Sequence, residues 1–274
     1  MVGDDPVGTA VTVRLALACA FVGLLIGSFL NVVIHRVPAG ESVVRPPSAC
    51  PGCRHEIRRR DNVPVLSWLV LRGRCRDCRA RISVRYPLVE AGTGLLFGIV
   101  GWWVGPAWEL PAYLYLAAIG VALTMIDLDV RRLPDAIVLP AYPVALLLLT
   151  GAAALSGEWG QLLRALIGCA AVFLLYGILF VVKPGGMGFG DVKLSGVLGL
   201  YLGWWSWSAL AVGTFAAFLL GGVVGLALVV AGRAGRKARI PFGPWMIAGG
   251  FLGILVADPI VHGYFQLVGL GDVV

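Results

Sequence analysis

The sequence predicts an all-α polytopic membrane protein with about eight transmembrane helices and a small insert between the first two. Hydrophobic residues make up 59% of the 274 residues and charged residues only 14%. A soluble domain is about 45–50% apolar and about 25% charged, so this composition excludes an ordinary soluble fold. The apolar residues also gather in runs close to the roughly 20 residues that a helix needs to cross the hydrocarbon core. One long polar gap between the first two runs defines the insert.

Eight apolar runs are the candidate spans: residues 11–34, 87–105, 111–126, 136–155, 162–182, 194–206, 208–231 and 244–268. The run at 194–206 is short and ends in Gly203, Trp204 and Trp205, so it is either a full span or a tilted or re-entrant segment. These runs divide the chain into a first transmembrane helix (1–35), an insert (36–86) and a transmembrane bundle (87–274).

The basic residues indicate which side of the membrane each loop faces. Twelve of the 22 Lys and Arg residues lie between Arg36 and Arg85, and cytoplasmic loops are enriched in these residues. A cytoplasmic insert places Asp4 and Asp5 outside, and alternation brings most other basic residues inside: Arg131, Arg132, Lys183, Lys193, Arg233, Arg236, Lys237 and Arg239. Arg14 and Arg164 do not fit. The net charge of +7 therefore mainly reflects membrane topology, and affinity for anionic lipid is a secondary interpretation. We expect no nucleic-acid partner.

The insert carries two Cys-x-x-Cys motifs, CPGC and CRDC, separated by 21 residues. Four thiolates in this pattern suit tetrahedral zinc, because each tight turn lets two sulfurs face one ion. Redox pairs or a disulfide are the alternatives, and a cytoplasmic location disfavours the disulfide. A site with four protein ligands has no open coordination position, so the predicted zinc is structural. The predicted ligands are Cys50, Cys53, Cys75 and Cys78.

Four aspartates lie near predicted span ends on the cytoplasmic side. MIDLDVRRLPDAIVLP contains Asp127, Asp129 and Asp135, and GMGFGDVKL contains Asp191. An ionisable group at that depth faces a protein interior or a wet cavity and marks function. The alternative is that Asp127 and Asp191 only cap helices or pair with nearby basic residues.

A cluster of glycines next to Asp191 favours the functional alternative. Gly185, Gly186, Gly188 and Gly190 permit positive φ and the close approach of another chain, which a simple cap does not need. The cluster is not a phosphate-binding loop, because it matches neither G-x-x-x-x-G-K-[ST] nor G-x-G-x-x-G and follows no strand. The chain after about residue 205 supplies no motif of this kind.

Five stretches together resemble the type IV prepilin peptidases, the leader peptidases of bacterial pilins and type II secretion pseudopilins. They are GSFLNVVIHRVP (27–38), the two cysteine motifs with DNVPVLSWLVLRGRC (61–75), YPLVEAGTG (86–94), IDLDVRRLPD (126–135) and GMGFGDVKL (186–194). The resemblance covers roughly residues 20 to 200. It implies a polytopic aspartic protease of the GxGD type in the bacterial inner membrane, with its active site at the cytoplasmic side.

The resemblance also implies the catalytic residues. The family's first catalytic aspartate lies eight residues before the Asp of the Leu-Pro-Asp element, which is Asp127 here, and its second is the Asp of Gly-x-Gly-Asp, Asp191. Two close carboxyl groups cannot easily both ionise, so they share a proton and act as general base and general acid on a water. We expect Gly188, Gly190 and Lys193 to form a substrate loop along which an extended chain binds by main-chain pairing. Alternatively, the Lys193 ammonium favours the ionised member of the carboxyl pair, or Lys193 is a plain interfacial anchor.

The implied substrates are type IV prepilins or pseudopilins, which have a short basic leader and an apolar helix in the membrane lipid. Many members of the family also methylate the new N-terminus with S-adenosylmethionine, and the zinc-type insert is characteristic of those longer forms. Several polar residues of the shared motifs organise the insert, line this second site, or only satisfy hydrogen bonds in the loops: Asn31, Arg36, Asp61, Asn62, Arg72 and Glu90. The sequence does not decide among these three roles.

Two other function classes remain open. An ion-coupled transporter also carries buried acids, although near the bilayer midplane and on inverted repeats that are not evident here. A non-catalytic zinc-bearing membrane scaffold is the other alternative.

Overall fold

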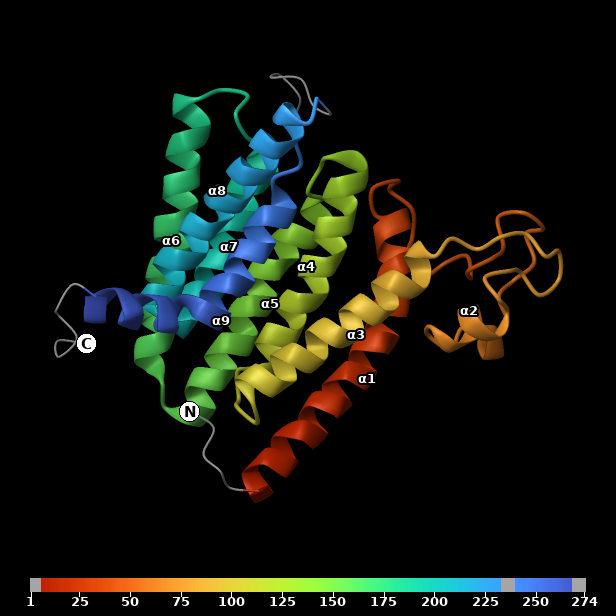
Figure 1. The fold of residues 1–274 in the computed structure, drawn as a ribbon, viewed down its shortest axis with the longest axis horizontal. Coiled ribbons are helices and arrows are strands. Elements are labelled where there is room, and N and C mark those ends of the chain that lie inside the picture. The colour runs from red at the N-terminus through yellow and green to blue at the C-terminus, as the bar shows by residue number, and fades with distance from the viewer. Residues whose placement is uncertain (1–5, 233–239, 268–274) are drawn as a thin grey trace. The chain divides into compact units, whose positions relative to one another are not determined.

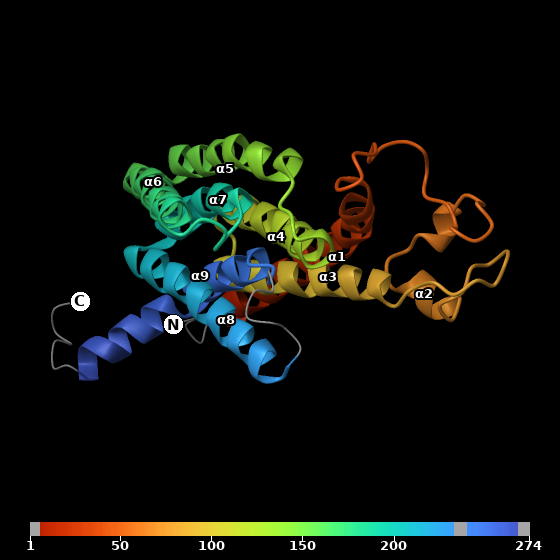
Figure 2. The same cartoon turned by 90° about the horizontal axis from the view of Figure 1, so that it is seen from above.

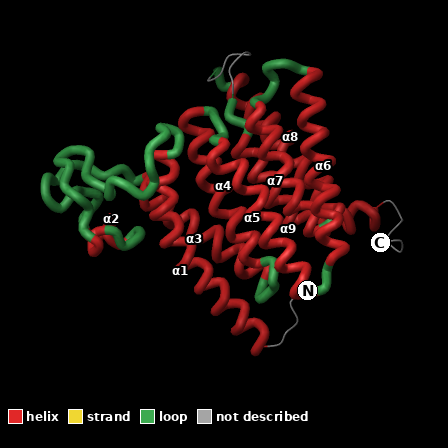
Figure 3. The backbone as a smooth tube through the Cα atoms, turned by 180° about the vertical axis from the view of Figure 1, so that it is seen from behind, coloured by secondary structure: helices red, strands yellow, loops and turns green. Residues whose placement is uncertain are grey.

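The computed structural model describes residues 6–232 and 240–267 (Figure 1). Within these ranges the regular elements are helices and no strand occurs, which confirms the predicted all-α fold class (Figure 3). Some residues used to predict the orientation lie outside these ranges. They are the N-terminal acids predicted to be outside and the last basic cluster predicted to be inside: Asp4, Asp5, Arg233, Arg236, Lys237 and Arg239.

The helices follow the predicted spans closely. In order they are α1 (Pro6–Arg36), the 3-10 helix η1 (Arg59–Asp61), α2 (Leu66–Val70), α3 (Arg85–Val104), α4 (Leu110–Val130), α5 (Asp135–Ser156), α6 (Trp159–Val182), α7 (Phe189–Trp205), α8 (Trp207–Val230) and α9 (Gly243–Leu267). Among the described residues, seven helices are long and apolar enough to cross a membrane: α1, α3, α4, α5, α6, α8 and α9. The chain is therefore a multi-pass membrane protein. The remaining long helix, α7, has 17 residues and a length of about 26 Å.

The chain forms two compact units, Met1–Ala122 and Leu123–Val274, and α4 runs from the first into the second. In the first unit α1 packs along α3 (Figure 1). Glycines allow this contact: a Cβ atom on Gly27 would lie 2.8 Å from the Cα of Glu90, and one on Gly101 would lie 2.8 Å from the sulfur of Cys19. Small residues at helix contacts are typical of membrane proteins, because they bring backbones close together.

Helix α7 is the central helix of the second unit. It packs against α5, α6, α8 and α9, and most of its residues are buried (Figure 2). Its contact with α6 is closest where two glycines face each other, because a Cβ on Gly168 would lie 2.6 Å from the carbonyl oxygen of Gly199. The protein covers α7 on all sides, so its sequence does not need the long apolar surface of a lipid-facing span.

Arg164, one of the two basic residues that did not fit the predicted orientation, lies in α6 and caps the C-terminus of α7. Its guanidinium donates to the carbonyl oxygens of Gly203 at 2.6 Å, Trp204 at 2.6 Å and Trp205 at 2.9 Å. The last carbonyls of a helix have no partner within the helix and carry partial negative charge, so a cation is favourable there. This contact gives Arg164 a structural role at its position.

Candidate functional site

Asp127 lies in the last turn of α4 and is 4% exposed. Its Oδ2 accepts the backbone N–H of Gly243, the first residue of α9, at 2.9 Å. The first N–H groups of a helix have no partner within the helix, so this carboxyl group satisfies one of them from another element. Gly243 also leaves room for the carboxyl group, because a Cβ atom there would lie 2.9 Å from the same oxygen.

Asp191 lies in the first turn of α7 and is 8% exposed. Its Oδ2 accepts the N–H of Gly188, the residue that precedes the helix, at 2.8 Å. An acidic side chain in the first turn is favoured by the helix dipole. The helix begins at Phe189, five residues before the predicted span at 194–206, so Asp191 is a helical residue.

The structure brings Asp127 and Asp191 together. Both acids are buried at helix ends, Asp127 in the last turn of α4 and Asp191 in the first turn of α7. Leu133 links their surroundings: a Cβ on Gly190 would lie 3.0 Å from the Cβ of Leu133, and a Cβ on Gly243 would lie 3.1 Å from its Cδ2. All of these residues belong to the second compact unit. Two buried acids from distant parts of the chain therefore share one local environment.

Lys193 faces α5. Its ammonium pairs with the carboxylate of Asp135, in the first turn of α5, and lies 5.2 Å from the centroid of the Phe189 ring. The hydroxyl of Tyr142 donates to the carbonyl oxygen of Lys193 at 2.6 Å. These contacts hold the first turn of α7 against α5. The partner of Asp135 therefore lies on α7, the helix that also carries Asp191. Contact between Lys193 and a substrate stays a prediction.

The glycines before Asp191 differ in what they do. Gly185 has positive φ (81°), whereas Gly188 is extended (φ −83°, ψ 153°) and Gly190 lies inside α7 against Leu133. Residues 183–186 and Gly188 are exposed beside the buried Asp191. The loop is thus an accessible edge next to a buried acid.

Sequence reasoning did not identify Gly243 or the aromatic residues around it. Phe242 precedes Gly243, and its ring lies 5.6 Å from the ring of Phe218 and 6.3 Å from that of Tyr176. Tyr176 is buried in α6. The Gly-Pro pair at 243–244 is typical of a helix start, but nothing local in the sequence indicates that its N–H binds Asp127.

The four predicted metal ligands form one cluster in the first unit. The Cys50 and Cys78 sulfurs are 3.7 Å apart, those of Cys53 and Cys75 are 4.0 Å apart, and all four lie within 4.8 Å of one another. A tetrahedral zinc with metal–sulfur distances of about 2.3 Å has sulfur–sulfur edges of about 3.8 Å. A disulfide needs about 2.05 Å. The donor set and its spacing fit a tetrahedral metal ion.

The two cysteine motifs form turns with matching backbone hydrogen bonds and φ angles. The Arg54 N–H donates to the Cys50 carbonyl oxygen at 2.8 Å, and the Arg79 N–H donates to the Cys75 carbonyl oxygen at 3.1 Å. Both arginines have positive φ, 59° and 62°. The backbone N–H groups of Cys53 and Gly52 lower the pKa of the Cys50 thiol to about 7, and thiolates are the form that binds metal. Two matched turns thus present their sulfurs to one point.

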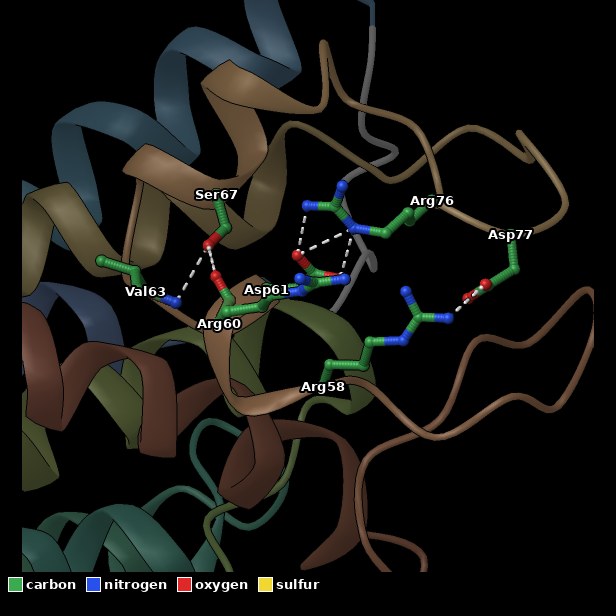
Figure 4. A network of polar contacts seen from close by, with 7 residues as sticks. All are labelled: Arg58, Arg60, Asp61, Val63, Ser67, Arg76 and Asp77. Atoms are coloured by element: carbon green, nitrogen blue, oxygen red, sulfur yellow. Dashed lines mark hydrogen bonds and ion pairs between the residues drawn. The ribbon is translucent and has the colours of Figure 1, made fainter.

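Ion pairs tie the second motif to the preceding chain (Figure 4). Arg76 donates to both oxygens of Asp61 at 2.6–3.1 Å, and Arg58 donates to Asp77 at 2.9 Å. The hydrogen bonds from Arg76 hold the pKa of Asp61 below its usual range. Arg76 and Asp77 are the middle residues of CRDC, so these contacts fix that turn against residues 58–61.

Three of the polar residues with open roles form hydrogen bonds to the backbone: Asn31 connects α1 to α3, Arg36 binds the chain after α1, and Glu90 connects α3 to the chain before α2. The side-chain amide of Asn31 donates to the Tyr86 carbonyl at 3.2 Å, and the Arg36 guanidinium donates to the Ser42 carbonyl at 3.0 Å. Glu90 accepts the Val65 N–H at 2.7 Å. The bond of Glu90 favours an organising role in the insert, whereas those of Asn31 and Arg36 satisfy backbone carbonyl groups. A role in the second site stays a prediction.

Fold and site together define a class: a multi-pass helical membrane protein with a buried pair of acids at helix ends and a separate four-cysteine centre. Residues 21–104 match the Bacterial Peptidase A24 N-terminal domain, and residues 114–230 match the Type IV leader peptidase family. The chain belongs to the type IV leader peptidase family, and the predicted resemblance is confirmed.

Curated relatives extend this similarity over most of the chain. A prepilin leader peptidase/N-methyltransferase of Stutzerimonas stutzeri is 38% identical over 92% of this chain and 94% of its own. Proteins with the same name in Pseudomonas aeruginosa and Aeromonas hydrophila are 37% and 39% identical, over 92% and 88% of this chain and 94% and 90% of their own. No solved structure is significantly similar to the chain.

Proposed function

We propose that this protein is a membrane aspartic endopeptidase that removes the short basic leader of type IV prepilin-like precursors. The observation that carries the proposal is the buried pair Asp127 and Asp191, each of which accepts a glycine N–H with Oδ2. Family membership and the names of the relatives support the same activity.

The pair performs the chemistry without a covalent intermediate. Two close carboxyl groups hold one proton between them and titrate as a unit. The ionised group takes a proton from a water that attacks the scissile carbonyl carbon, and the protonated group donates to the carbonyl oxygen. Oδ2 of each acid already accepts a glycine N–H, so in this proposal Oδ1 is the oxygen that acts on water and substrate.

The exposed loop at 183–188 is the proposed binding edge for the substrate strand. Gly188 is extended and has no side chain, so an extended peptide can approach its backbone. With Gly190 and Lys193, it forms the proposed substrate loop. In this proposal Lys193 acts through the first turn of α7, since its ammonium already pairs with Asp135.

The substrates are pilins or pseudopilins in the bacterial inner membrane, and the active site faces the cytoplasm. The orientation is supported by the arginine-rich insert, which holds twelve of the 22 basic residues. A carboxyl pair at the inner membrane face meets a basic leader where its apolar helix leaves the lipid.

Replacing either acid by Asn tests the proposal. Asp127→Asn and Asp191→Asn keep the shape of the side chain and remove the shared proton, so cleavage of a purified precursor should fall about 10²- to 10⁴-fold. Asp129→Asn, on the exposed side of α4, is the matched control and should cleave normally. Unimpaired cleavage by both Asn variants would reject the catalytic pair, and a wild-type protein without cleavage activity would return the transporter and scaffold alternatives.

The four cysteines are proposed to hold a structural zinc. When bound, the ion cross-links the two turns of the insert, and Cys50, Cys53, Cys75 and Cys78 supply all four ligands. Metal analysis of the purified protein should give one zinc per chain, and Cys50→Ser should lose the zinc and destabilise the insert. A Cys50→Ser protein with full zinc content would contradict this assignment.

A second activity, N-methylation of the new N-terminus with S-adenosylmethionine, is proposed from the names of the relatives. The described residues contain no strand, so they include no glycine-rich strand-to-helix turn of the kind that binds such cofactors in doubly wound folds. No residue is therefore assigned to the cofactor. Mass spectrometry of a co-expressed precursor measures both cleavage and the added methyl group.

A further inference from the structure

The insert carries an exposed apolar face that neither the carboxyl pair nor the cysteine cluster uses. Leu66, Leu69 and Val70 of α2 are spaced i, i+3 and i+4, so they share one side of the helical turn. These residues are 60%, 57% and 76% exposed, and Val63 just before them is 44% exposed. A group of exposed large apolar residues marks an interaction surface.

The polar groups of this segment have hydrogen-bond partners within the insert. The Ser67 hydroxyl accepts the Val63 N–H at 3.0 Å and donates to the Arg60 carbonyl at 3.3 Å (Figure 4). The indole N–H of Trp68 donates to the Ile82 carbonyl at 3.2 Å. The backbone N–H groups of residues 66, 67, 69 and 71–73 also have backbone partners. A segment paired in this way tolerates a medium with little water.

One hydrogen bond sets the depth of α2 relative to a membrane span. The Val65 N–H, directly before α2, donates to Glu90 of α3 at 2.7 Å. Glu90 lies five residues after Arg85, so it is about 7.5 Å along the helix axis from the start of the span. Arg85 and Tyr86, which begin α3, are residue types that gather at the membrane–water interface. The apolar face of α2 therefore lies at the level of the interface.

Charge favours the same partner. Arg60 and Arg72 flank α2 and are exposed, whereas Arg58 and Arg76 in the same insert are held by Asp77 and Asp61. Exposed arginines next to an apolar face are typical of segments that bind anionic headgroups and insert apolar side chains beneath them.

We propose that α2 is an interfacial anchor. Leu66, Leu69 and Val70 enter the lipid beside α3, and Arg60 and Arg72 contact anionic headgroups. The anchor and the Glu90 bond together hold the cysteine-bearing insert at the membrane surface. This proposal does not depend on the proteolytic activity.

Site-specific photocrosslinking tests it. The full-length protein, with benzoylphenylalanine at position 69 or 70, is placed in nanodiscs of phosphatidylcholine with or without phosphatidylglycerol, irradiated, and analysed by mass spectrometry. Val44, which is 78% exposed elsewhere in the insert, is the matched control position. We expect lipid adducts at positions 69 and 70, a higher yield with phosphatidylglycerol, and no lipid adducts at position 44.

Three results would overturn the proposal. Crosslinks from positions 69 and 70 to peptides of residues 123–274 would identify the second unit as the partner, and crosslinks between chains would identify a second copy. Adduct yields as low as at position 44 would mean that the face is in water. Equal lipid adducts at all three positions would show that α2 has no special part in membrane contact.

Discussion

Replacing Gly243 by Ala should slow cleavage without unfolding the protein. Gly243 lies at the start of α9, and its N–H donates to Asp127 at 2.9 Å. An added Cβ would lie 2.9 Å from the Asp127 oxygen and 3.1 Å from Leu133 Cδ2. The extra methyl group therefore pushes directly on the carboxyl group that the glycine holds.

The expected effect follows from the displacement. Ordinary contacts of a Cβ atom begin at 3.4 Å, so either the Asp127 oxygen or the start of α9 must move by about half an ångström. A misplacement of about 1 Å can cost about 100-fold in rate, and a hydrogen bond to a charged group contributes about 1.5–3 kcal/mol. We expect kcat to fall about 10- to 100-fold, with KM little changed because the substrate loop is untouched.

The assay is cleavage of a purified precursor, with Gly263→Ala as the control. Gly263 lies in the same helix, and a Cβ there would meet no atom within 4 Å. That substitution should leave the rate unchanged, and Ala favours the helix over Gly by up to about 1 kcal/mol. If Gly243→Ala cleaved as fast as Gly263→Ala, the contact with Asp127 would have no part in catalysis.

Three further predictions concern the supports of the two sites. Asp135→Lys and Lys193→Asp should each slow cleavage, and the double swap should restore part of the rate because it restores the ion pair that holds the first turn of α7; a Lys193 that contacted only substrate would not be rescued. Arg164→Ala should destabilise the second unit by about 2 kcal/mol or more in thermal unfolding, because three carbonyls lose a charged donor, whereas an unchanged Tm would contradict the cap. Asp61→Asn should destabilise the insert at neutral pH. That difference from wild type should vanish as the pH falls through the lowered pKa of Asp61, since only the ionised carboxylate binds its arginine; a difference independent of pH would exclude the ion pair.

The spans and the metal cluster were predictable because their signals are local. The predicted run at 87–105 matches α3 at Arg85–Val104, since an apolar stretch of that length has few alternatives to a membrane helix. The cysteine pairs likewise predict their own turns. Helix α7 was predicted to begin at 194 and begins at Phe189, because Asp191 and Lys193 lowered the apolar signal. The hydrogen bond of Asp191 is local, but Lys193 pairs with Asp135 on α5, and local hydropathy does not include such a partner.

The role of Gly243 was also not predictable from local sequence. Its bond to Asp127 joins residues 116 positions apart, and it depends on where α9 packs. Lys193 is a second example. Its position in the motif predicts a role next to Asp191, but its ion pair with Asp135 depends on how α7 packs on α5.

The two acids differ in how their positions are maintained. The hydrogen bond of Asp191 spans three residues within one turn, so it forms whenever α7 forms. The bond of Asp127 requires α9 to be in place, and α9 is held by close contacts with α8, where a Cβ on Gly249 would lie 2.5 Å from the Ala217 nitrogen and one on Gly253 would lie 2.7 Å from the Ala209 oxygen. A change that shifts α9 therefore alters the surroundings of Asp127 and leaves the cap at Asp191 intact. Of the two carboxyl groups, Asp127 is the one whose geometry depends on tertiary packing, and substitutions far from the site act on the pair through it.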